Sequence, residues 1–163
     1  VDRYPDFAAE AKAFGPVCEA DFNRLPFEDN FADGLLCECS LSLAEIKSQV
    51  LAECYRVLKA EGRLIVSDIF RMQKVDLAGP GSAVRSYDCL AGAVGLETMR
   101  KLLSDSGFEI EHYRDHSPAL KELAARLVWH FGSADVLKEL TGNEGCGAFG
   151  DALFIARRRK DAP

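Results

Sequence analysis

The chain has 163 residues, and its 26 acidic and 20 basic side chains give a formal net charge of −6. This length suits one domain with a buried core, and an apolar share of 48% excludes a disordered chain. The acidic balance excludes general attraction to nucleic acid or to anionic membranes, and no apolar run reaches the roughly 18 residues of a membrane span. The first residues lack the basic and apolar regions of a secretion signal, so we expect a cytoplasmic protein.

The first half of the chain alternates helical and strand patterns. Apolar residues at helical spacing predict helices over 6–14 and 44–59, and Gly62 is expected to cap the second. Short apolar runs predict three strands, over 16–21, 31–42 and 63–68. The run at 31–42 is apolar enough for a buried strand, and the nearly continuous run at 63–68 is typical of a parallel strand covered on both faces.

The same alternation continues after an irregular segment at about 70–95. The patterns predict helices over 96–106, 118–131 and 134–140, and strands over 108–113 and 148–156. We therefore expect a single domain over 1–163, with an irregular insert at about 70–95 and a helical insert at about 117–142.

Strands that alternate with helices predict an α/β fold, specifically a doubly wound parallel sheet. Such sheets bind small ligands beyond the carboxyl ends of their strands. The residues that follow the predicted strands are therefore the candidates for a binding site: Asp2, Asp21, Phe22, 37–42 and 68–70.

Two stretches of the chain resemble motifs of the class I S-adenosylmethionine-dependent methyltransferases, a superfamily with a Rossmann-like sheet. Residues 21–30 (DFNRLPFEDN) are similar to the D-A-x-x-L-P-F-x-D stretch of its type 11 members. Residues 53–64 (ECYRVLKAEGRL) resemble the E-x-x-R-V-L-K-P-G-G-x-L element that follows it. The resemblance covers most of residues 1–113 and implies methyl transfer from S-adenosyl-L-methionine to a small-molecule acceptor.

The resemblance also implies which residues hold the cofactor. Asp2 resembles the acid that accepts hydrogen bonds from both ribose hydroxyls, a task that suits the two oxygens of a carboxylate. Asp21 resembles the acid that receives the adenine amino group, and the Phe22 backbone N–H resembles the donor to an adenine ring nitrogen. Cys37, Glu38 and Cys39 end the strand that lies beneath the methionine part. The alternative for both aspartates is that they only cap turns or helices.

One family feature has no counterpart in the chain. The glycine-rich loop G-x-G-x-G, which lets the backbone approach the cofactor closely, is absent. We therefore expect a partial domain, a sheet incomplete at its N-terminus, with roughly 40 to 80 residues missing by analogy with the family. The alternative is a noncatalytic, methyltransferase-like remnant or partner domain whose sheet is completed by another chain.

A weaker likeness lies at residues 87–93 (YDCLAGA), which resemble the C-x-x-G-A segment of arsenite methyltransferases. It implies that Cys89 binds trivalent arsenic, with partners among Cys37, Cys39 and Cys146, because soft thiolates suit a thiophilic centre. The alternative is that Cys89 only packs or shapes a substrate loop. Tyr87 and Asp88 are candidate substrate contacts in the same irregular insert.

The remaining side chains identify no further site. The six cysteines include no C-x2-C pair and have no histidine nearby, so no metal site is expected. No residue can be named as a catalytic base. The expected partners are the small-molecule acceptor and a second copy in a homodimer, with neither nucleic acid nor a membrane.

Overall fold

The computed structural model describes residues 6, 9, 10, 12, 13, 15–72, 89–141 and 146–160. In chain order its helices and strands are β1 (Ala32–Glu38), α2 (Lys47–Val57), β2 (Leu58–Arg71), α3 (Leu96–Asp105), β3 (Phe108–Asp115), α4 (Ser117–Phe131), α5 (Asp135–Thr141) and β4 (Phe149–Arg158). A short 3-10 turn at Cys146–Ala148 precedes β4. Among these helices none has the length and apolar character needed to span a bilayer.

The four strands form one sheet in the order β1-β2-β4-β3. β1 and β2 run parallel, whereas β4 is antiparallel to both of its neighbours. The α/β class is confirmed, but the prediction of a parallel sheet is wrong for the second half. β4 enters between β2 and β3 after α4 and α5, and from there it runs back along both strands.

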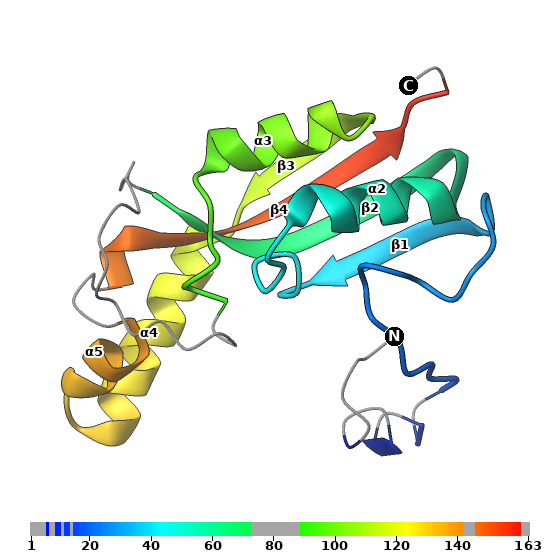
Figure 1. Ribbon diagram of the computed structural model, residues 1–163. Coiled ribbons are helices and arrows are strands. Elements are labelled where there is room, and N and C mark those ends of the chain that lie inside the picture. The colour runs from blue at the N-terminus through cyan, green and yellow to red at the C-terminus, as the bar shows by residue number, and fades with distance from the viewer. Residues whose placement is uncertain are drawn as a thin grey trace.

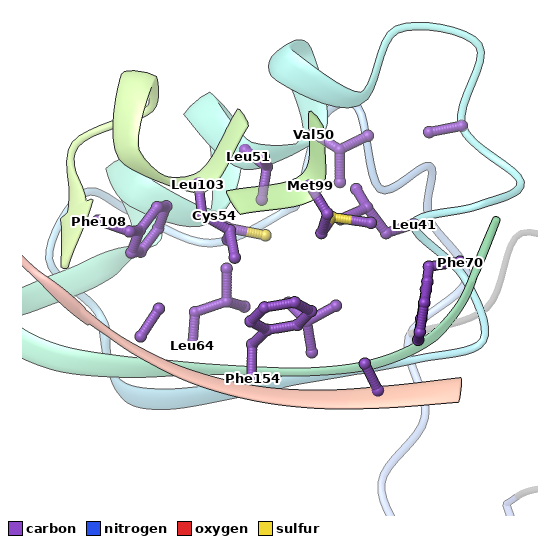
Figure 2. Close-up of a cluster of buried hydrophobic side chains, with 14 of the residues drawn as sticks. Leu41, Val50, Leu51, Cys54, Leu64, Phe70, Met99, Leu103, Phe108 and Phe154 are labelled. Carbon is purple, nitrogen blue, oxygen red and sulfur yellow. The ribbon is translucent and has the colours of Figure 1, made fainter. Parts of the chain in front are cut away.

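The helices lie on both sides of this sheet (Figure 1). α2 and α3 cover one face, and the main core lies beneath them, where Leu51 and Leu103 meet Leu64 and Phe154 of the sheet (Figure 2). α4 and α5 extend from the opposite side, where Leu120 packs near the buried Phe149. The α2–α3 side is therefore the well-packed one.

Two predicted strands differ from the structure in the segment before α2. Residues 16–21 form no strand. Among them only Glu19 makes an isolated β-bridge. Of the run at 31–42, residues 32–38 form β1, but none of these seven residues is buried, and Leu36 is 66% exposed. In the described part of the chain β1 pairs only with β2, so it is an edge strand, which accounts for the exposure of its residues.

The junction between α2 and β2 is tighter than predicted. β2 starts at Leu58, directly after the helix, and the Leu58 N–H donates to the Cys54 carbonyl. Leu58 is fully buried and already pairs with Ala32, so strand pairing ends the helix. Gly62 is therefore no helix cap; it lies inside β2, and the left-handed residue there is Glu61, with φ of 66°.

Candidate functional site

Four acidic residues lie along one end of the sheet, which we call the acidic edge. β1, β2 and β3 end at this edge and β4 begins there, as the pairing directions require. Each strand contributes one acid: Glu38, Asp68, Asp115 and Asp151. Asp68 and Asp115 both pair with Ala152, from opposite sides of β4. The edge therefore combines negative charge with the carboxyl ends of a parallel strand pair, where α/β sheets bind ligands.

Asp68 organises the loop between β1 and α2. Its side chain is buried, and its two carboxylate oxygens accept the N–H groups of Ser42 and Ile69, each at 2.8 Å. The Lys47 ammonium donates to the carbonyls of Ser42, at 3.3 Å, and Ala44, at 3.0 Å. Burial lowers the pKa of Lys47, while the Asp68 charge opposes that change. An irregular loop thus stays buried because charged groups satisfy its backbone.

The two thiols that end β1 have different surroundings. Cys37 is half-buried and lies 3.2 Å from the Ser40 hydroxyl, and burial raises its pKa. Cys39 is exposed, has a φ of 46°, and donates its N–H to the Ser67 carbonyl at 2.8 Å. Burial of part of its surface raises the pKa of Cys39, as do the charges of Asp68 and Cys89. Both groups therefore remain thiols, not thiolates, at neutral pH.

Cys89 lies within electrostatic range of Cys39, since its charge contributes to the raised pKa of that thiol. Asp151 contributes too, and burial raises its own pKa against the charge of His116. The sequence left Cys37, Cys39 and Cys146 open as thiol partners of Cys89, and which of them Cys89 uses stays a prediction. It missed Asp151, which follows a glycine inside a strand pattern and carries no motif.

Asp21 closes a local turn. Its Oδ1 accepts both the Asn23 backbone N–H, at 2.8 Å, and the Asn23 side-chain amide, at 2.7 Å. Its own carbonyl accepts the Arg24 N–H at 2.9 Å. The turn-capping alternative thus holds for one carboxylate oxygen. The contact of Asp21 with adenine stays a prediction.

A pocket of about 230 Å³ lies beside this turn. The residues on either side of Asp21, Ala20 and Phe22, line it together with β1, α2 and β2; the other lining residues are Leu25, Phe27, Leu35, Leu36, Cys37, Ser40, Val50, Cys54 and Leu64. Its wall is mainly apolar, with a hydroxyl and two thiols. Such a pocket suits a flat apolar ring with a few polar atoms.

The predicted site residues thus fall into two neighbourhoods. Phe22 and Cys37 line the pocket, whereas Glu38, Cys39 and Cys89 belong to the acidic edge. Asp2, Tyr87 and Asp88 lie outside the described residues. Within the described ranges, no three metal-binding side chains come together, and free thiols are recorded for Cys18, Cys37, Cys39, Cys54 and Cys89.

Residues 1–66 match the family described as "Methyltransferase domain". The chain is 28% identical over 128 residues to the ubiquinone/menaquinone biosynthesis C-methyltransferase UbiE of Neisseria gonorrhoeae, covering 66% of this chain and 52% of that enzyme. It is 28% identical over 93 residues to the arsenite methyltransferase of Halobacterium salinarum, covering 55% of this chain and 23% of that enzyme. The chain thus spans about half the length of the first relative and about a quarter of the second.

A structural likeness extends over nearly the whole chain. The geranyl diphosphate methyltransferase in complex with SAM superposes with a TM-score of 0.66 at 15% identity, covering 96% of this chain and 66% of that one. The similarity supports the Rossmann-like arrangement of the sheet and its helices. The matched family residues, 1–66, include every residue that lines the pocket.

Proposed function

Because the chain belongs to the class I S-adenosylmethionine-dependent methyltransferase superfamily, we propose that it binds S-adenosyl-L-methionine and transfers the methyl group to a small-molecule acceptor. The observation that carries the proposal is the pocket beside Asp21. It is formed wholly by residues within the matched family region, and β1, β2 and α2 all contribute to its wall.

The residues present fit part of the cofactor. The pocket between Phe22 and Cys37 offers an apolar site for the purine, and Asp21 supplies a carboxylate next to it. The thiols and carboxylates that end β1 suit the methionine part. When bound, the cofactor supplies a methyl group on a positively charged sulfur, which departs as a neutral thioether.

The task of the protein is then mainly alignment. Holding acceptor, methyl and sulfur in line contributes up to about 7–11 kcal/mol in favourable cases. The acidic edge of Glu38, Asp68 and Asp151 favours a positively charged group beside it, because carboxylates stabilise a nearby cation. A base is required only for an acceptor that must lose a proton before it attacks.

Two alternatives to methyl transfer to a small molecule make different demands on the site. A noncatalytic domain would keep the sheet without binding the cofactor. Arsenic chemistry at Cys89 remains a prediction: Cys39 is a thiol within electrostatic range, but no group of three metal-binding side chains occurs in the described part of the chain.

Asp21→Asn tests the cofactor site by calorimetric titration with S-adenosylhomocysteine. Asparagine keeps an oxygen for the turn with Asn23 but loses the second carboxylate acceptor and the charge. A hydrogen bond to a charged group contributes about 1.5–3 kcal/mol, so the Kd should rise by roughly 10- to 100-fold.

Asp33→Asn is the matched control. Asp33 lies in the same region, exposed and paired with Lys59 at 2.8 Å, and it does not line the pocket. The control should bind as the parent protein does. Equal affinity of Asp21→Asn and the parent would restrict Asp21 to its turn, whereas no heat from the parent would favour the noncatalytic alternative.

A further inference from the structure

A turn at residues 89–92 is attached to the end of β2 by Arg71. This arginine is buried, yet it donates from Nε to the Ala93 carbonyl, at 3.1 Å, and from its terminal nitrogen to the Leu90 carbonyl, at 3.4 Å. Its backbone N–H donates to the Val94 carbonyl at 2.9 Å. Arg71 therefore binds the backbone carbonyls of Leu90, Ala93 and Val94, in and just after the turn.

The guanidinium also lies 5.1 Å from the centre of the Phe149 ring, at the start of β4. Ala93 and Phe149 belong to the same buried cluster. The turn is thus packed as well as hydrogen-bonded. The Arg71 guanidinium lies against the Phe149 ring while its N–H groups donate to backbone carbonyls.

On its other side the turn presses on the loop that Asp68 organises. A Cβ at Gly92 would lie 1.8 Å from the Ser42 carbonyl oxygen, so only glycine permits this approach. The Ser42 N–H is the group held by Asp68, and the Ser42 carbonyl is the group held by Lys47. Contacts therefore run without a break from Arg71 through the turn to the loop after Cys39.

We propose that Arg71 and Gly92 are positioning residues that hold the turn of Cys89 against the loop after Cys39 and make this turn one wall of the acceptor site. The proposal rests on the proposed function for the identity of that site. Neither Arg71 nor Gly92 is proposed to contact the cofactor or the acceptor. Their role is to hold the turn at 89–92 and the loop after β1 in one fixed position relative to each other, next to the acidic edge.

Alkylation of single cysteines by iodoacetamide, followed by peptide mass spectrometry, tests the positioning. In Gly92→Ala the turn must move away from Ser42, so Cys89 should react about tenfold faster, as expected for local opening of a packed segment. Gly95→Ala is the matched control, because a Cβ there meets only the Thr98 hydroxyl, at an ordinary 3.9 Å.

Cys54 serves as an internal gauge of global unfolding, since it is buried in the main core and burial raises its pKa to about 12. Its alkylation should not change in Gly92→Ala. Arg71→Met should behave like Gly92→Ala, and Arg71→Lys, which keeps a donor and a charge, should restore most of the protection. A parallel rise at Cys54 in both Gly92→Ala and Arg71→Met would mean that the two residues serve only overall stability, and it would overturn the proposal.

Saturating S-adenosylhomocysteine tests whether the turn borders the site. It should slow alkylation of Cys39 and Cys89 in the parent protein, and of Cys39 alone in Gly92→Ala. Cofactor binding measured by calorimetry without any protection of Cys89 would exclude the turn from the site. Absence of binding would instead contradict the proposed function and leave the variant comparison of Cys89 intact.

Discussion

At the scale of single residues, one glutamate decides the shape of the pocket wall. Glu53 of α2 accepts the Leu25 N–H at 2.8 Å and pairs with Arg56, which in turn donates to the Leu25 and Phe27 carbonyls and to Asp29. Glu53 and Arg56 are one helical turn apart, so a single face of α2 holds the loop that lines the pocket. The motif E-x-x-R thus has a structural reason: its two charged side chains hold the loop that lines the pocket.

Glu53→Gln should lower the Tm at neutral pH. The hydrogen bond from Arg56, helped by the Leu25 N–H, lowers the pKa of Glu53 below its ordinary value of 4.5. A depressed pKa means that the carboxylate stabilises the fold above 4.5, and that this stability is lost as the pH falls through the lower folded-state pKa. The difference in Tm between variant and parent should therefore be full at pH 7 and should disappear below that pKa, as thermal unfolding at several pH values would show.

Glu45→Gln, at an exposed position before α2, removes the same charge and should leave the Tm nearly unchanged. A Tm difference for Glu53→Gln that does not depend on pH would contradict the role of its ionised form.

At the scale of elements, two amphipathic helices of similar pattern have different importance. α3 buries Met99 and Leu103 against the sheet. α4 leaves Leu123, Phe131 and the 90% exposed Trp129 open to solvent. An amphipathic pattern shows which face of a helix is apolar, but not how much of that face another element covers.

Leu103→Ala and Leu123→Ala should therefore differ strongly in stability. Leu103 is fully buried, and truncation of such a leucine costs about 2–5 kcal/mol of unfolding free energy. Leu123 is 51% exposed, and its truncation should cost no more than about 0.5 kcal/mol. Urea denaturation followed by circular dichroism measures both; an equally large loss for Leu123→Ala would mean that α4 is covered in solution.

At the scale of the whole molecule, the sheet is unevenly protected. β1 is an edge in the described residues, and Leu36 pairs across the sheet with Ile65, which pairs with Ile155. Cross-strand partners share a face, so these three side chains form an apolar row on the side turned away from α2 and α3. An exposed apolar edge strand promotes association between chains. The homodimer expected from the sequence stays a prediction, and β1 is the strand through which it would form.

Leu36→Lys should reduce concentration-dependent self-association, because a charge on an edge strand opposes pairing with another strand. Sedimentation velocity at increasing protein concentration measures the effect. Leu43→Lys is the control, since Leu43 is also exposed but lies in the loop after β1. Unchanged association of Leu36→Lys would show that another surface mediates it.

Local patterns were enough to find most elements. The strand at 63–68, the helix at 96–106 and the helix at 118–131 all occur, because apolar periodicity reflects the face that each element buries. The motifs around Asp21 and Glu53 lie beside the pocket, and the cofactor contacts that they imply stay predictions. Where the structure differs, as at β1, the missing information is the number of neighbours a strand has.

Sequence alone thus indicated the α/β class, the likeness to methyltransferases and the segments that line the pocket. Only the tertiary structure decided that β4 lies between β2 and β3, that Asp68 holds Ser42, and that Arg71 holds the turn of Cys89. These contacts join residues about 20 or more positions apart. Periodicity acts over a few residues, whereas such partners are selected by packing of the whole chain and by the need to satisfy every buried polar group.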